Sequence, residues 1–248
     1  RLVTRNAVSL IFPLPLSYKD KIRQVDGVSL VSWGNWFGGI YVSEKNFFAN
    51  FCVEPRSYLA LYPEFILSEA EKKAFLADRK GFIAGRKLVE RFGWKPGDTV
   101  TLKGIIFPGN WDFVLRGVYR GRDRTIDETQ FLFHWEYLNE TVRQRYPGRA
   151  DQVGFYMIGV QSPDRAADVA GAIDRQFKNS LAETLTETEK AFQLGFISMT
   201  EAIVMAPPRC RAMSIHFVTV SMGLSRRTTI TCGTVASIET GTKSPWAS

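Results

Sequence analysis

Two histidines are the first candidates for acid–base or metal chemistry in this chain, because imidazole titrates near neutral pH and binds metal ions. His134 and His216 lie 82 residues apart, so the sequence does not suggest a histidine-rich metal site or a histidine-based triad. His134 directly precedes Trp135 at the expected start of a helix. We expect it to be a capping or core-edge residue.

Two close pairs of carboxylates, Asp127 with Glu128 and Glu187 with Glu189, have the residue types of a general acid and base. Such catalysis also needs a cleft, which no pattern indicates, so surface or helix-start positions are the favoured interpretation. The sequence has no Gly-x-x-x-x-Gly-Lys-Ser/Thr or Gly-x-Gly-x-x-Gly run to bind a phosphate. If ATP drives this protein, another polypeptide or domain must bind it. We assign no catalytic, cofactor-binding or metal-binding residue.

Several arginines close together suggest a surface for nucleic acid, with aromatic residues such as Trp111 and Tyr119 nearby. The arginines are Arg116, Arg120, Arg122 and Arg124. The acidic residues among them are Asp112, Asp123, Asp127 and Glu128. Because these dilute the positive field, a solvated hairpin is favoured and no nucleic-acid partner is expected. A salt-sensitive shift in the gel mobility of DNA or RNA on adding the protein would reverse that preference.

Glycine and aromatic residues alternate in the segment between two expected strands, over 28–31 and 47–53. The aromatic residues are Trp33, Trp36, Phe37 and Tyr41. They form either a surface for a ligand or partner, or the cover over the edge of a core, and the sequence leaves both open.

The composition indicates a folded chain with a sizeable core. It has 248 residues, of which 45% are hydrophobic and 13% aromatic, enough for one large domain or two small ones. No stretch approaches the roughly 20 apolar residues that span a bilayer, and no signal peptide is evident. The start at Arg1 suggests a fragment. The three cysteines, Cys52, Cys210 and Cys232, give no support to a disulfide framework.

Turn residues and periodicity predict mixed helices and strands. Ser68 caps a helix that runs to about Asp78. A compact strand–helix–turn–strand unit follows over 81–102, with Gly93 ending its helix and Pro96-Gly97-Asp98 making its turn. The remaining expected elements are a lead-in and short helix over 10–22, strands over 112–119 and 153–160, a helix over 134–145, and a helix over 162–177 with Ala167, Ala170 and Ile173 facing inward.

The last regular element is predicted over 187–206. Its apolar stripe, at spacings of four, three and four, consists of Phe192, Phe196, Met199 and Ile203. Pro207 and Pro208 end this helix.

Residues 207–248 read differently from the rest. They contain 13 Ser or Thr and a single acidic residue, Glu239, and they contribute +4 of the net charge of +7. Our leading hypothesis is a translated frameshift or cloning scar, and the alternative is a natural disordered or basic tail. Mass spectrometry of the native gene product distinguishes the two.

One run of residues carries a family resemblance. Residues 85–102, GRKLVERFGWKPGDTVTL, closely resemble the G-r-x-L-a-x-x-f-G-x-x-x-G-D-x-v-x-l segment of MacB-like periplasmic core domains, found in FtsX-like ABC-transporter permeases. Flanking segments 22–28, 113–119 and 179–187 resemble that family in order and spacing, so the likeness covers roughly residues 5–206. On its own, the periodicity of the sequence predicts only a mixture of helices and strands.

The resemblance implies an α+β (mixed) fold with two lobes. Residues 1–54 and 151–206 would form a porter-like α/β lobe of a MacB-like periplasmic core domain, and residues 55–150 a smaller inserted α/β lobe. In that family one transmembrane helix precedes the domain and three follow it. Membrane attachment would therefore run through helices absent from this sequence.

The resemblance also implies a function: the extracytoplasmic domain of an ABC-transporter permease in the bacterial inner membrane. It would couple ATP-driven motion of a separate ATPase subunit to export, extraction or force transmission, without an active site or cofactor of its own. The implied partners are that ATPase, a second permease copy, and a periplasmic adaptor or outer-membrane protein. A free-standing periplasmic binding or scaffolding module is the alternative, and an unrecognised hydrolase dependent on Asp127 or Glu128 is a third hypothesis.

Overall fold

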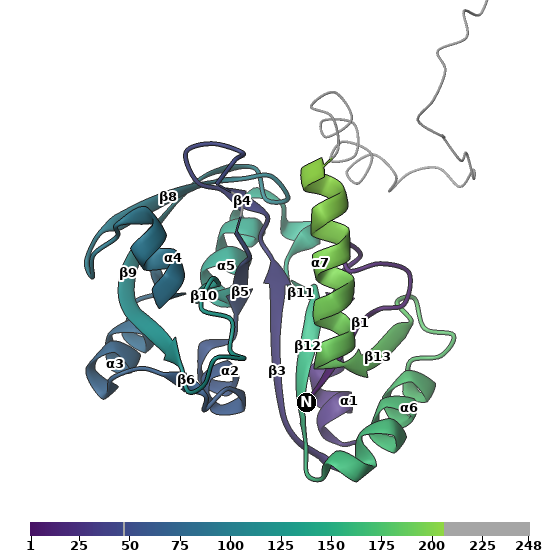
Figure 1. The fold of residues 1–248 in the computed structure, drawn as a ribbon. Coiled ribbons are helices and arrows are strands. Elements are labelled where there is room, and N and C mark those ends of the chain that lie inside the picture. Colours follow the sequence, from purple (N-terminus) through teal and green to yellow (C-terminus); the bar gives the residue numbers. More distant parts are fainter. Residues whose placement is uncertain (47, 206–248) are drawn as a thin grey trace, which may run out of the picture.

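A computed structural model describes residues 1–46 and 48–205, which form a mixed α/β fold around one long sheet (Figure 1). The sheet has the strand order β13-β1-β12-β3-β5-β10-β7-β9-β8-β4, with β6 paired to β9, and β2 pairs separately with β11. The helices are α1 (Tyr18–Arg23), α2 (Pro55–Leu61), α3 (Glu69–Ala77), α4 (Arg86–Phe92), α5 (Trp135–Arg145), α6 (Ala166–Gln176) and α7 (Glu189–Met205), with 3-10 turns η1 (Pro147–Arg149) and η2 (Pro163–Arg165). The strands are β1 (Leu2–Asn6), β2 (Leu14–Pro15), β3 (Val28–Trp36), β4 (Gly39–Ile40), β5 (Asn50–Val53), β6 (Phe65–Ile66), β7 (Gly81–Gly85), β8 (Thr99–Gly104), β9 (Gly109–Gly121), β10 (Phe131–His134), β11 (Gln152–Val153), β12 (Phe155–Val160) and β13 (Thr184–Thr188).

The two halves of the sheet differ in direction and curvature. From β13 to β5 every neighbouring pair is antiparallel, whereas β10 runs parallel to β5 and β9 parallel to β7. Only two residues separate β3 from β4, yet β3 pairs with β5 and β4 pairs with β8 at the far end of the order. The second half therefore curls back on itself.

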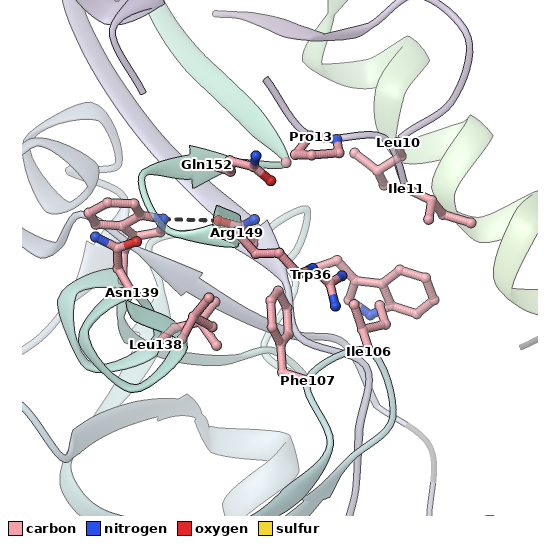
Figure 2. Close-up of a pocket in the computed structure, with 14 residues that line it drawn as sticks. Leu10, Ile11, Pro13, Trp36, Ile106, Phe107, Leu138, Asn139, Arg149 and Gln152 are labelled. Atoms are coloured by element: carbon pink, nitrogen blue, oxygen red, sulfur yellow. Dashed lines mark hydrogen bonds between the residues drawn. The ribbon is translucent and has the colours of Figure 1, made fainter. Parts of the chain in front are cut away.

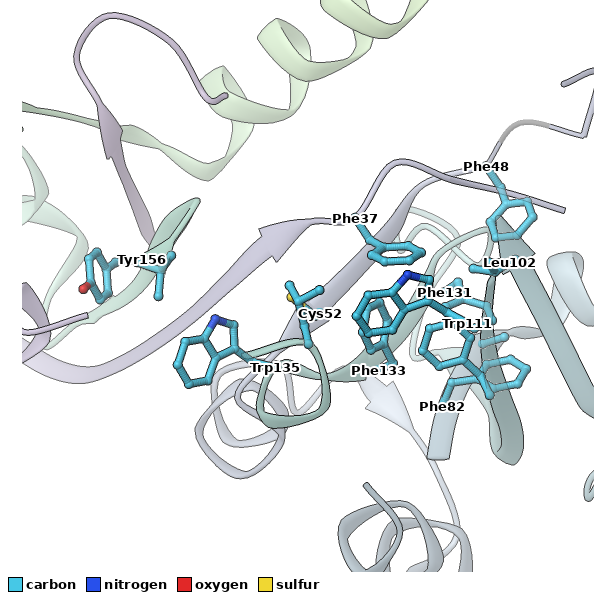
Figure 3. Close-up of a cluster of buried hydrophobic side chains, with 14 of the residues drawn as sticks. Phe37, Phe48, Cys52, Phe82, Leu102, Trp111, Phe131, Phe133, Trp135 and Tyr156 are labelled. Atoms are coloured by element: carbon cyan, nitrogen blue, oxygen red, sulfur yellow. The ribbon is translucent and has the colours of Figure 1, made fainter. Parts of the chain in front are cut away.

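Aromatic side chains fill the curled half. Phe37, between β3 and β4, is fully buried and lies 5.2–6.1 Å, ring centroid to ring centroid, from four other aromatic residues. These are Phe107, Trp111, Phe113 and Phe133. Figure 3 shows Phe37 above Phe133 and Trp111 in this cluster. Phe37 thus belongs to the core and not to a ligand surface.

The strand–helix–turn–strand unit over 81–102 forms as the sequence predicts. β7 is buried throughout, and Gly85 is required at its end because a Cβ there would lie 2.1 Å from the carbonyl oxygen of Glu128. Gly93 ends α4 in the left-handed conformation at φ 69°. β8 then alternates exposed and buried residues. The predicted helix after Ser68 is also confirmed: its hydroxyl accepts a hydrogen bond from the Glu71 amide in a capping box.

Several sequence expectations are wrong in detail. Trp33 and Trp36 lie on β3 and not in a loop, because β3 continues to Trp36 and pairs with β5 and β12. Ala167 is exposed, and the buried face of α6 carries Val169 together with Ile173. The last helix begins at Glu189, since Glu187 pairs within β13. Elements that the sequence did not predict include α2, β1, β4, β6, β10, β13 and η1.

Other expectations stay predictions. The sheet runs without interruption through the proposed lobe boundaries at residues 54 and 150, so the two-lobed division remains a proposal. The tail 207–248 and Ala206 lie outside the described residues. Within the described ranges no helix combines the length and the apolar character needed to cross a bilayer.

Candidate functional site

The residues singled out for chemistry are dispersed in the structure. His134 is buried at the end of β10, where its Nε2 atom lies 2.7 Å from the Phe75 carbonyl oxygen and its ring packs on Phe75. Burial lowers the pKa of His134. His134 is therefore a neutral residue at the edge of the core, as the sequence predicts.

The first carboxylate pair is structural. Asp127 accepts hydrogen bonds from the amide and hydroxyl of Thr129. Glu128 is not a surface residue, because only 6% of it is exposed. It accepts a hydrogen bond from the Gly121 amide at 2.9 Å and binds Arg86 at 3.2 Å. The Gly121 amide, together with Arg86, lowers the pKa of Glu128. This carboxylate therefore stays charged and bound to its two partners.

The arginine cluster is also divided. Arg116 forms an ion pair with Asp78 at 2.8 Å, whereas Arg120, Arg122 and Arg124 are exposed at the end of β9 and beyond it. These side chains line neither of the pockets described below. Within the described part of the chain, no group of three His, Cys, Asp or Glu residues is placed to hold a metal ion.

The second carboxylate pair lies where the first strand, the last strand and the last helix meet. β1 pairs antiparallel with β13, with Leu2 opposite Thr188, and α7 begins at the next residue. The Thr188 hydroxyl accepts a hydrogen bond from the Ala191 amide at 3.2 Å, which satisfies a free donor in the first turn of α7. We call this region the β1–β13–α7 junction.

Arg1 connects the parts of the junction. Its guanidinium binds Glu189 at 2.7 Å and Glu64 at 2.6 Å, and lies 4.1 Å from the ring centroid of Tyr62. Partial burial opposes the positive charge, but the hydrogen bonds to Glu64 and Glu189 outweigh it and raise the pKa of Arg1. The Tyr62 hydroxyl donates to Glu189 at 2.7 Å. The start of α7 is thereby fixed to β1 and to the end of α2.

Polar contacts also join β13 to its neighbours. Arg5 binds Glu187 at 2.8 Å, and the Thr4 and Thr186 hydroxyls lie 2.8 Å apart in a buried pair. On the other side, Asp174 of α6 accepts hydrogen bonds from the Thr186 amide at 3.0 Å and the Thr186 hydroxyl at 2.7 Å. Because β13 is an edge strand, this carboxylate occupies a donor that would otherwise be open to another chain.

The first two residues of the α7 stripe pack on the sheet, and the side chains of Met199 and Ile203 lie outside the described part of the structure. Phe192 contacts Phe155 of β12 at 5.8 Å, and Phe196 contacts Trp36 at 5.4 Å and Phe51 at 5.3 Å, centroid to centroid. Figure 1 shows α7 lying over this part of the sheet. The outward residues Leu194 and Ile197 are 61% and 51% exposed. The structure thus joins two features that the sequence showed separately, the aromatic segment and the apolar stripe.

The junction was only partly foreseeable. Glu187 and Glu189 were noted as carboxylates, but Arg1, Tyr62 and Glu64 carry no local signal, because their roles depend on pairing across the chain. The arrangement offers no activated nucleophile or open acid–base pair. What it offers is a stiff connection between α7 and the sheet.

Comparison with known proteins supports the same architecture. No protein-family model and no curated protein matches the chain. Among solved structures, the extracellular domain of the noncanonic ABC-type transporter YknZ from Gram-positive bacteria superimposes with a TM-score of 0.52 at 12% identity, covering 76% of this chain and 100% of that one. The periplasmic region of MacB from Actinobacillus actinomycetemcomitans gives 0.51 at 8% identity, covering 79% and 91%.

The fold is that of a MacB-like periplasmic domain. The predicted mixed α/β class and the resemblance stated from residues 85–102 are confirmed at the level of fold. At this low identity the likeness carries no site residue, so the contacts above remain the basis for assigning roles.

Proposed function

We propose that this chain is the extracytoplasmic domain of an ABC-transporter permease subunit in a bacterial inner membrane. It passes the ATP-driven motion of a separate ATPase subunit on to export, extraction or force transmission. The ATPase, a second permease copy, and an adaptor or outer-membrane protein are its partners in this proposal. ATP hydrolysis takes place on the ATPase and not on this chain.

The β1–β13–α7 junction is the observation that carries the proposal. Leu2 lies opposite Thr188, so any segment preceding residue 1 would emerge beside the first turn of α7. A displacement applied there reaches the sheet through three connections. These are the β1–β13 pairing, the Arg1 ion pairs with Glu64 and Glu189, and the packing of Phe192 and Phe196 on the sheet. The shared fold with YknZ and MacB domains supports this arrangement.

The first experiment is to sequence the complete gene and its neighbours. The proposal expects four hydrophobic spans, one before this region and three after it, and an adjacent ATPase gene whose product copurifies. An intact reading frame without hydrophobic spans on either side would overturn the proposal and favour a free-standing periplasmic module.

The second experiment tests coupling through α7 in the full-length transporter. Phe196→Pro removes a helix hydrogen bond and clashes with the preceding turn, at a cost of about 3 kcal/mol or more, whereas Phe196→Leu keeps the helix and an apolar contact. Spin labels on Leu181→Cys, a fully exposed position, report the distance between two copies, because Cys52 is buried and any other accessible cysteine of the transporter is replaced by Ser. We expect ATP to change this distance in the parent protein and in Phe196→Leu but not in Phe196→Pro, with ATP binding equal in all three. An unchanged ATP response in Phe196→Pro would refute coupling through α7.

A further inference from the structure

A pocket of about 70 Å³ lies between the loop that carries Leu10–Pro13 and the helix α5. Figure 2 shows Leu10, Ile11 and Pro13 on one side, Ile106, Phe107 and Leu138 on the other, and Arg149 between them. Trp36 and Trp135 also line it. A water needs roughly 10–15 Å³ of such space, so the pocket has room for a small molecule and not for a large one.

The polar groups around this pocket are mainly donors. Its lining includes no Asp or Glu. Arg149 has no ion pair or side-chain hydrogen bond in the described part of the chain, and the same is true of the Gln152 side-chain amide.

Asn35 supplies a further donor whose orientation is determined by its neighbour. Only 8% of this residue is exposed. Its Oδ1 atom accepts a hydrogen bond from the Trp135 indole at 3.0 Å, so its Nδ2 group must lie on the opposite side. There Nδ2 is 3.7 Å from the position that a Cβ on Gly154 would occupy, and Gly154 lines the pocket. No described residue accepts a hydrogen bond from this amide.

The walls of the pocket are apolar, which restricts the class of ligand further. Leu10, Ile11 and Pro13 face Phe107 and Leu138 across the pocket (Figure 2). Inorganic anions would leave these walls wet, whereas a molecule with both an anionic and an apolar end would satisfy walls and donors together. Arginine suits a planar carboxylate because its guanidinium can bind both oxygens.

We propose that this pocket binds a small amphipathic carboxylate, with Arg149 and Gln152 holding the carboxylate and the Leu10–Pro13 and Phe107 walls covering a short apolar group. This chemistry has two sources, a short fatty acid and the C-terminal residue of a peptide. The proposal concerns a binding site on this chain alone and does not depend on transport.

Isothermal titration of the 248-residue chain tests the proposal with two matched pairs of probes. Hexanoate and hexanol represent the fatty-acid source, and N-acetyl-leucine and its amide represent the peptide source. We expect at least one carboxylate to bind with a Kd below about 1 mM, and its neutral partner at least tenfold more weakly. The carboxylate that binds more tightly identifies the source. Equal binding of carboxylate and neutral partner, or no binding of either carboxylate at 10 mM, overturns the proposal.

Variants of Arg149 assign the contact. Arg149→Gln should weaken carboxylate binding at least tenfold and Arg149→Glu should abolish it, because each removes the charge that the carboxylate meets. Arg124→Gln is the matched control: it removes the same charge from another exposed arginine, one that does not line the pocket. Since Arg149 has no ion pair or side-chain hydrogen bond with a described residue to lose, all three variants should unfold close to the parent temperature. Unchanged affinity in Arg149→Gln refutes the site.

Discussion

Replacing Phe37 by alanine tests how the curled half of the sheet is closed. The ring is fully buried and packs between Phe107, Trp111, Phe113 and Phe133. Deletion of a phenylalanine ring from such a site costs about 3–5 kcal/mol, which combines lost burial with the cavity that remains. Because the free energy of unfolding of a domain is about 5–15 kcal/mol, Phe37→Ala should lose a large fraction of its stability. Urea denaturation followed by circular dichroism measures this loss.

The same substitution should have a local signature. Phe37 lies between β3 and β4, and β4 pairs with β8 through Gly39 opposite Gly104 and Ile40 opposite Lys103. Without the ring, this short pairing loses the packing that holds it, so hydrogen exchange at Ile40 and Lys103 should accelerate more than exchange in β1 or β12. Val8→Ala is the control, because Val8 is 79% exposed and such surface changes stay within about 0.5 kcal/mol. A loss below about 1.5 kcal/mol in Phe37→Ala, or exchange that accelerates equally throughout the sheet, would refute the reasoning.

Three further predictions concern single contacts. Ser68→Ala removes the capping box with Glu71 and should cost about 1 kcal/mol in urea denaturation. The pKa of His134 is lowered in the folded chain, so the unfolded chain binds a proton more readily. Stability should therefore fall as pH drops below about 6.5. His134→Gln can still donate to the Phe75 carbonyl oxygen and should lessen this fall. Asp174→Ala frees the Thr186 amide on the edge of β13 and should increase self-association, measured by sedimentation velocity in the ultracentrifuge.

Each of these has an outcome that contradicts it. Equal stability of Ser68→Ala and the parent would show that the cap contributes nothing. An identical pH dependence of His134→Gln and the parent between pH 5 and 7 would assign the acid sensitivity to other groups. A monomeric Asp174→Ala with normal exchange at Thr186 would show that the edge is protected by something other than this carboxylate.

Local chemistry made part of the fold predictable. The capping box at Ser68 and the left-handed stop at Gly93 are determined within a few residues, so their helices begin and end as the sequence indicates. The alternation over Thr99–Gly104 likewise needs only one buried face. These signals depend on neighbours in the chain and remain valid in any tertiary context.

Elements defined by distant pairing were missed for a physical reason. β13 buries Thr184 and Thr186 and exposes its apolar residue Leu185, so it lacks the apolar alternation of a strand. Its pairing is set by Thr4, which lies opposite Thr186 and 182 residues away. β4 and β6 have two residues each, too few for any period. β10 is a fully buried apolar run, and such a run does not show a two-residue alternation because both faces of the strand are covered.

The roles of charged and amide side chains are the least predictable from sequence, because they depend on which residues the fold places beside them. Glu128 is buried since Arg86, 42 residues earlier, and the Gly121 amide both satisfy it. Asn35 and Arg149, by contrast, come together at a pocket with donors unused, although nothing in their flanking sequence distinguishes them from Glu128. Burial of a polar group is favourable only when its partners are present, and the Asn35 Nδ2 and Arg149 donors, which bind no described residue, are accessible to a partner from outside the chain. This asymmetry is why the pocket, and not the carboxylate pairs, is the stronger candidate for binding.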